Sequence, residues 1–133
     1  MDHSKSRALK DEFANRPAPL VVPIERFFEG NDDLGSIGCN LIPHPGIDVF
    51  RDVLGGLLDR PDVEAVYALI AELDPGDDCW PFSDTVLVFG QISDKALSAA
   101  VSLLEPHEVG LENELDPGIA DLHDSPVRVV WWD

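Results

Sequence analysis

The stretch Glu29-Gly-Asn-Asp-Asp-Leu-Gly-Ser-Ile-Gly-Cys-Asn-Leu41 is the one on which the predicted fold depends. It starts as an acidic loop with two glycines and then alternates from Ser36 to Ile42, which predicts a half-buried strand. One face of this strand would carry Ile37, Cys39 and Leu41, and the other Ser36, Gly38 and Asn40. We expect the strand to be central in the sheet. Loops that precede such strands frequently hold functional residues.

Two helices are predicted after this strand. The first follows the turn Pro43-His-Pro-Gly46, has apolar residues at helical spacing (Ile47, Phe50, Leu54, Leu57 and Leu58) and stops at Pro61. Its internal pair Gly55-Gly56 costs about 1 kcal/mol per glycine relative to alanine, which suggests close packing on the sheet. The second helix has Ser93 as its N-cap and ends before Pro106.

Three further strands complete the predicted sheet. Thr85–Ile92 is rich in β-branched and aromatic residues, and Val127–Trp132 closes the chain. Residues 62–74 fit a helix or a buried strand, and we favour the strand because Thr85–Ile92 needs an antiparallel partner. The acidic residues 107–126 are a long connection that wraps the surface or holds a turn of helix.

The N-terminal part is expected to be simpler. Residues 1–19, which end in Arg-Pro-Ala-Pro, are predicted to be a flexible tail, and residues 20–133 a single α+β domain. Leu20–Val22 would add a short edge strand. Ile24–Glu29 would form one or two helical turns anchored by Phe27 and Phe28.

The order strand, helix, strand, strand, helix, strand is the split βαβ pattern of ferredoxin-like folds. Right-handed crossovers would place both helices on one face of a four-stranded antiparallel sheet. The other face would be open to solvent, to a partner or to the N-terminal segment. Ser36, Gly38 and Asn40 are predicted to lie on that open face.

The charge of the chain is its most unusual property. It has 26 acidic and 9 basic residues, and residues 27–133 hold 22 of the acidic but only 4 of the basic ones. Nucleic acids and anionic membranes are excluded as partners because both require Lys and Arg. A basic protein partner is favoured, since opposite fields speed encounter and fix orientation. Solubility alone explains the acidity equally well.

The two cysteines form neither a disulfide framework nor a zinc motif. Cys39 is expected to be a buried structural thiol because it alternates with core residues. The first 16 residues lack the apolar region of a signal peptide, and no apolar run is long enough to span a membrane. The sequence therefore predicts a cytoplasmic protein with both cysteines reduced.

A metal site is the first chemical hypothesis. Glu29, Asp32 and Asp33 lie close together with Asn31 and Ser36, and their oxygen atoms suit calcium or magnesium. The spacing is not that of an EF-hand, however, and Asp and Asn also favour turns. The alternative function is thus a metal- or small-ligand-binding enzyme that uses the acidic loop 29–40. No cofactor and no catalytic residue is predicted.

A protein-binding surface is the second hypothesis, and the preferred one. Large aromatic residues stand next to carboxylates in the 80–84 segment and at the C-terminus, an arrangement that suits a partner rich in Arg and Lys. Trp131 and Trp132 could equally lie on opposite faces of a sheet as ordinary packing residues. The predicted partner-binding residues are Asp32, Asp33, Asp78, Trp80, Asp84, Glu112 and Glu114.

Several segments resemble a family of small uncharacterised bacterial proteins: Phe27-Phe-Glu-Gly-Asn-Asp-Asp33, Gly35-Ser-Ile-Gly-Cys-Asn-Leu41 and Trp80-Pro-Phe-Ser-Asp84. The resemblance covers nearly all of the chain from residue 20 onward. Small acidic cytoplasmic proteins of this kind are similar in character to immunity proteins, which neutralise toxins. By analogy, the resemblance implies an inhibitor that masks a basic site on its partner.

Overall fold

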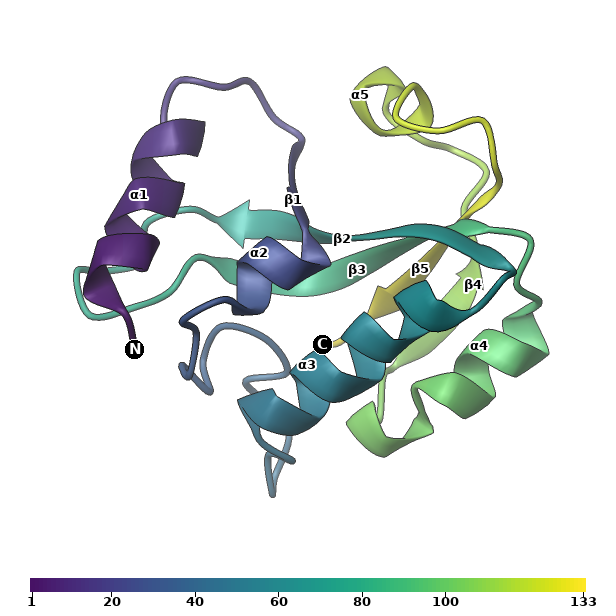
Figure 1. The fold of residues 1–133 in the computed structure, drawn as a ribbon, viewed down its shortest axis with the longest axis horizontal. Coiled ribbons are helices and arrows are strands. Elements are labelled where there is room, and N and C mark those ends of the chain that lie inside the picture. Colours follow the sequence, from purple (N-terminus) through teal and green to yellow (C-terminus); the bar gives the residue numbers. More distant parts are fainter.

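Five antiparallel strands form one sheet in the computed structural model, which describes residues 1–133 (Figure 1). The strands are β1 (Leu20–Pro23), β2 (Val63–Glu72), β3 (Phe82–Gly90), β4 (Glu108–Leu111) and β5 (Val127–Trp131). Their order in the sheet is β1-β2-β3-β5-β4, so β1 and β4 are the two edges. The fold is α+β, as the sequence predicts.

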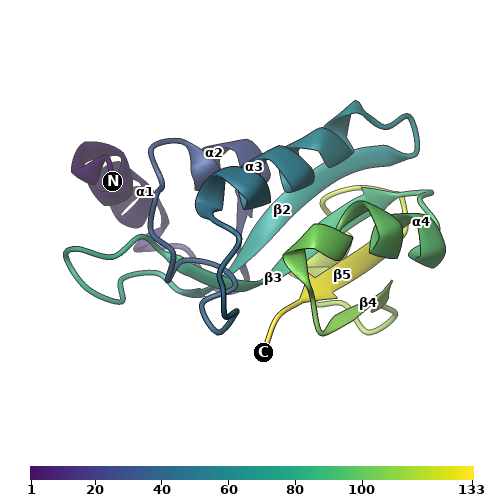
Figure 2. The same cartoon turned by 90° about the horizontal axis from the view of Figure 1, so that it is seen from below.

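The helices lie on both faces of this sheet. They are α1 (His3–Phe13), α2 (Ile24–Phe28), α3 (Ile47–Gly56), α4 (Asp94–Ala100) and the short α5 (Pro117–Ala120), with 3-10 turns at Leu57–Asp59 and Ser102–Leu104. Figures 1 and 2 show α3 running along β2 and α4 beside β5, whereas α5 lies on the opposite side of the sheet. Helices α1 to α4 share the main hydrophobic core, and Ile119 of α5 belongs to a second, smaller cluster.

The β2–β3 hairpin is confirmed, and with it the choice of strand for residues 62–74. Its register pairs Val66 with Val88 and Ala68 with Val86. These side chains face the main core, while Tyr67 and Leu69 of β2 contact the second cluster. Because both faces of β2 are covered, its residues 65–71 are apolar or aromatic on both faces and mimic a helical pattern.

Most of the other predicted elements are present. Strand β1 lies at an edge, α2 is anchored by the buried Phe27 and Phe28, and the Ser93 hydroxyl accepts from the Ala96 N–H at the start of α4. Helix α3 forms as expected, but the prediction that its glycines pack closely on the sheet is wrong. A Cβ at Gly55 or Gly56 would have no atom within 4 Å.

The predicted central strand at residues 36–42 is wrong, because this segment is a loop. Gly38 has φ +64°, which a strand does not accommodate, and a Cβ added there would lie 2.5 Å from Cζ of Phe50. Ser36 and Ile37 are both buried, whereas neighbouring residues of a half-buried strand would lie on opposite faces of the sheet. The sheet therefore has five strands rather than four, and without its first strand the ferredoxin-like split βαβ pattern is not confirmed.

The predicted flexible tail at residues 1–19 is wrong for most of its length, because His3–Phe13 form helix α1. Asp2 caps this helix by accepting from the Lys5 N–H, and Leu9 and Phe13 are buried in the main core. Lys10 is also buried, with its Nζ 2.9 Å from the Gly76 carbonyl oxygen and 3.1 Å from Asp74 Oδ1. These contacts join α1 to the loop between β2 and β3. None of the helices is long and apolar enough to cross a membrane.

The connection 107–126 has more structure than predicted. It contains the expected helical turn, α5, but also the edge strand β4, which pairs with β5. After β4 the chain crosses over the face of the sheet that α3 and α4 leave uncovered, and Ile119 packs there against Leu87. This crossing creates a hollow between the segment and the sheet.

Candidate binding groove

A cavity of about 450 Å³ lies between the sheet and the 112–119 segment. Its floor is mainly apolar and comes from β2, β3, β5 and α5, with Leu69, Thr85, Leu87, Leu115, Ile119, Val129 and Trp131. Its rim consists of four carboxylates, those of Glu108, Glu112, Glu114 and Asp116. We call this cavity the acidic groove. No lysine, arginine or histidine lines it.

The topology explains why these residues meet. Side chains alternate along β5, so Val129 and Trp131 lie on the groove face while Val130 lies in the main core. Glu108 pairs directly with Trp131 across β4 and β5, which places a carboxylate beside the indole. Trp131 is half-buried, and its ring meets the ring of His107 edge-on at 5.7 Å.

None of the four rim carboxylates takes part in an ion pair, a property that they share with other exposed carboxylates of this acidic chain. Eight of the nine lysines and arginines are paired with carboxylates elsewhere. Two rim residues also shape the loop: Glu112 Oε1 accepts from the Glu114 N–H, and Asp116 Oδ1 accepts from the Gly118 N–H as the N-cap of α5. The groove therefore has an uncompensated negative charge above an apolar floor.

The groove contains two of the predicted partner-binding residues, Glu112 and Glu114. The groove itself was not predicted, and Glu108, Asp116 and Trp131 were not among the seven named partner-binding residues. The 108–124 connection was nevertheless expected to contribute to the binding surface, and Trp131 was one of the aromatic residues considered for it. Trp131 could have been found from the alternation of Val127–Trp132, which puts it opposite the core residue Trp132. Glu108 could not, since its neighbour Trp131 is defined only by the pairing of β4 with β5.

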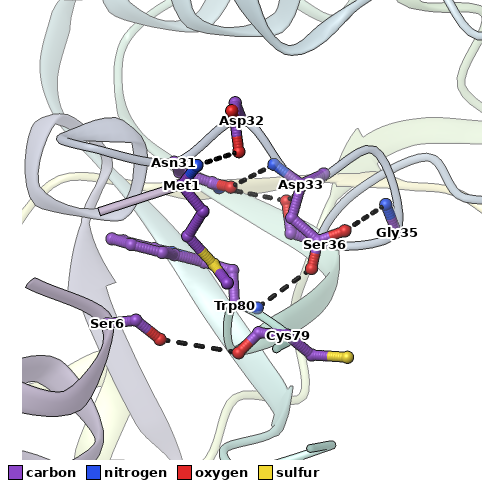
Figure 3. A network of polar contacts seen from close by, with 9 residues as sticks. All are labelled: Met1, Ser6, Asn31, Asp32, Asp33, Gly35, Ser36, Cys79 and Trp80. Carbon is purple, nitrogen blue, oxygen red and sulfur yellow. Dashed lines mark hydrogen bonds and ion pairs between the residues drawn. The ribbon is translucent and has the colours of Figure 1, made fainter. Parts of the chain in front are cut away.

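The acidic loop is a separate region, shown in Figure 3. Asp33 Oδ1 accepts from the Gly35 N–H and its Oδ2 from the Trp80 N–H, both at 2.9 Å. Asn31 is buried and donates to the Ser36 hydroxyl, which in turn donates to the Asp33 carbonyl oxygen. These bonds build the loop and hold it against the start of β3.

The candidate metal ligands of this loop do not converge. Asp32 binds the Met1 α-amine at 2.8 Å, and this bond lowers the pKa of its carboxyl group. Glu29 binds Lys5 at 2.8 Å, which likewise lowers the pKa of Glu29. Asp33 is occupied by the backbone of Gly35 and Trp80. No group of three or more His, Cys, Asp or Glu side chains is arranged to hold a metal ion.

The remaining predicted partner-binding residues lie outside the groove. Trp80 is only 1% exposed, so its assignment as a contact residue is wrong. Asp78 is exposed in the β2–β3 loop, and Asp84 is half-buried beside a small hollow that Asn40 and Asp133 also line. Cys39 is exposed rather than buried, and it lines a shallow hollow together with Cys79. Both cysteines are free thiols.

A polar network fixes the end of the 112–126 segment on the sheet. Tyr67 Oη lies 2.8 Å from His123 Nε2, and His123 Nδ1 lies 3.1 Å from Glu64 Oε1. The Ser125 hydroxyl donates to Glu64 Oε2 at 2.6 Å. The hydroxyl thus faces the carboxylate and not the imidazole. We interpret the network as a structural latch.

The latch should depend on pH through Glu64. The hydrogen bond from Ser125, followed by His123, lowers the pKa of Glu64 below its usual value near 4.5. A lowered pKa contributes stability that is present above the usual value and is lost as the pH falls through the folded-state value. We expect Glu64→Gln to reduce the urea midpoint at pH 7, and the gap from the parent to close as the pH falls through the lowered pKa of Glu64. An unchanged gap at both pH values would contradict this role, and Glu25→Gln, an exposed carboxylate without an ion pair, is the control.

The chain is similar to known proteins over almost its whole length. The model of the "Uncharacterized protein YfbO family" matches residues 4–128, which include nearly all of α1 and the segment that forms the groove. A curated relative, "Uncharacterized protein YfbO" of Escherichia coli (strain K12), is 31% identical over 121 residues, covering 88% of this chain and 84% of the relative. No solved structure matches the chain.

Proposed function

The chain belongs to the YfbO family, and for this member we propose a non-enzymatic binding role in which the acidic groove holds a basic protein partner. The observation that carries this proposal is the apolar floor of the groove under four carboxylates without cationic partners. An arginine or lysine side chain matches both parts, because its aliphatic stem packs on apolar surface while its charged end remains near carboxylates. The indole of Trp131 adds a cation–π contact.

The charge of the rest of the molecule supports the same type of partner. The chain has a formal net charge of −17, and nearly all of its few basic residues are already paired within the fold. Such a field accelerates the encounter with a cationic protein and repels anionic ones. An acidic protein that occupies the basic functional surface of its partner acts as an inhibitor. We therefore extend the proposal to an immunity-like inhibitor in the cytoplasm.

The test compares two variants with the same change in net charge. The rim variant is Glu108→Gln, Glu112→Gln, Glu114→Gln and Asp116→Asn, which keeps an acceptor at Glu112 and a good N-cap for α5. The control variant is Glu25→Gln, Asp59→Asn, Glu72→Gln and Glu105→Gln, four exposed carboxylates without ion pairs. Partners are captured from extracts of the source organism at low salt, identified by mass spectrometry and titrated by calorimetry.

We expect a basic partner whose affinity falls at least about tenfold for the rim variant and less than about threefold for the control, because carboxylates at the contact matter more than distant ones. The affinity of the parent should also fall as salt is raised. Equal losses for both variants would indicate non-specific attraction. Undiminished binding to the rim variant, or the absence of a basic partner at low salt, would exclude the groove as the binding site.

A further inference from the structure

The two edges of the sheet are not equally available for pairing. Strand β1 ends in Pro23 and follows Pro17 and Pro19, and proline blunts an edge because it has no N–H to donate. Strand β4 contains no proline, and no segment of the chain pairs with its outer side. The Glu112 N–H donates to the Val127 carbonyl oxygen. Because backbone groups alternate in an antiparallel ladder, the N–H and C=O groups of Val109 and Leu111 point away from β5.

The acidic groove reaches this free edge. A second hollow of about 460 Å³ runs along β4 and shares Glu108, Glu112 and Val129 with the groove. Gly110 lies between the two carboxylates on the same face of the strand. A Cβ at Gly110 would have no atom within 4 Å, so the lack of a side chain leaves a passage from the edge to Val129.

We propose that the partner binds as an extended segment that adds to the outer edge of β4 as a sixth strand. This inference rests on the proposed function and specifies its partner. Every second side chain of an added strand lies on the groove face, so three consecutive ones stand opposite Glu108, Gly110 and Glu112. Opposite charges across neighbouring strands are favourable, which calls for basic residues opposite the two glutamates.

The residue opposite Gly110 has the most room. A long side chain at this position crosses the glycine and reaches Val129 and the indole of Trp131. Arginine fits best, since its planar guanidinium stacks on an aromatic ring and also binds carboxylates. The recognised segment therefore has the pattern basic-x-Arg-x-basic in extended conformation. A second copy of this chain is a poor occupant, because two β4 edges would bring their rim carboxylates together.

The probe is a capped eight-residue peptide of alternating arginine and valine. With its arginines on the groove face, the valine N–H groups face β4 and the arginine N–H groups face away. Methylation of the valine backbone nitrogens therefore removes the hydrogen bonds that these N–H groups would donate to the Val109 and Leu111 carbonyl groups. Methylation of the arginine backbone nitrogens, which leaves the guanidinium groups unchanged, is a matched control with equal charge and an equal number of methyl groups.

We expect the parent and arginine-methylated peptides to bind with similar affinity and the valine-methylated peptide at least about tenfold more weakly, because the hydrogen bonds to the Val109 and Leu111 carbonyl groups are lost. The Val109 and Leu111 amides should gain protection from hydrogen exchange in the complex. Gly110→Tyr should fill the passage, since its Cβ meets no atom within 4 Å, and should weaken binding at least about tenfold at an unchanged melting temperature.

Equal binding of the three peptides without protection at Val109 and Leu111 would overturn strand addition while leaving a charge-driven binding role intact. Failure of all three peptides to bind would also overturn it, and the rim variant then tests the binding role separately with the captured partner. Concentration-dependent dimers that disappear in Gly110→Tyr would assign the edge to a second copy and contradict the proposal.

Discussion

Gly90→Ala is expected to lower the free energy of unfolding by about 3 kcal/mol or more, because the backbone at this position admits only glycine. Gly90 ends β3 with φ +148°, and a Cβ there would lie 2.2 Å from the carbonyl oxygen of Asp62. That oxygen already accepts from the N–H groups of Gln91 and Ile92. The clash is with backbone, so the start of β2 and the turn before α4 must separate and both hydrogen bonds are strained.

Two other glycines serve as controls for this prediction. At Gly110 and Gly55 an added Cβ meets no atom within 4 Å, and neither residue has positive φ. Gly110→Ala should be neutral or slightly stabilising in its strand, and Gly55→Ala should stabilise α3 by about 1 kcal/mol. Urea denaturation followed by far-ultraviolet circular dichroism measures all three variants. If Gly90→Ala were as stable as Gly110→Ala, the close approach of Asp62 would not exist in solution.

The elements predicted correctly from the sequence are those whose local signals agree with their environment. Thr85–Ile92 combines β-branched residues with burial, and α3 and α4 have apolar stripes and clear ends. For residues 62–74 the local signal was ambiguous, and the need of β3 for a partner resolved it. Pairing between strands thus supplied what periodicity alone could not.

The segment 36–42 shows how alternation misleads. Apolar residues occupy every second position, at Ile37, Cys39 and Leu41. Only Ile37 is buried, however, and Cys39 is exposed. Seven residues are too few to distinguish a strand from a loop with one anchor. The signals against a strand were present in Gly35, Gly38 and Asn40, which favour turns.

Helix α1 was missed for the opposite reason. Ser6, Leu9, Lys10 and Phe13 are the buried residues of this helix, and their spacing is helical. Only two of them are apolar, so the stripe is hidden among charged residues. Lys10 is buried because the Gly76 carbonyl oxygen and Asp74 satisfy its ammonium group, and a sequence does not reveal such tertiary partners.

The candidate site was predicted in its chemistry but not in its place. Acidic charge beside aromatic residues was expected, and the groove has both. Of the predicted residues, however, Glu112 and Glu114 line it while Asp33 and Trp80 are bound to each other in a different region. The pairing of β4 with β5 near the C-terminus decides which carboxylates lie around Trp131, and the sequence pattern did not indicate this pairing.

Replacing Trp132 is expected to have the second large effect on stability. Its side chain is 2% exposed, and its ring centroid lies 5.5 Å from that of Phe50. Its Nε1 donates to the Leu104 carbonyl oxygen at 2.8 Å. Trp132→Ala should cost about 3–5 kcal/mol through the cavity that it leaves. Trp132→Phe should cost about 2–3 kcal/mol, because a buried carbonyl group loses its donor and a smaller void remains.

Trp80 provides the matched comparison. It is equally buried, but its Nε1 has no hydrogen-bond acceptor within the protein. Trp80→Phe therefore removes an unsatisfied donor together with part of the ring, and we expect a cost of about 1 kcal/mol or less. Urea denaturation followed by far-ultraviolet circular dichroism is suitable, since tryptophan fluorescence changes with each variant.

The order of the two phenylalanine variants is the decisive result. The ring is reduced equally in both, so a larger loss for Trp132→Phe measures its hydrogen bond to Leu104. Equal losses would show that this bond contributes little or that Trp80 Nε1 has a partner such as a buried water. Trp131→Phe should leave stability nearly unchanged, because this ring is half-buried and has no hydrogen bond from its Nε1. Any effect of that substitution on peptide affinity can then be assigned to the floor of the groove.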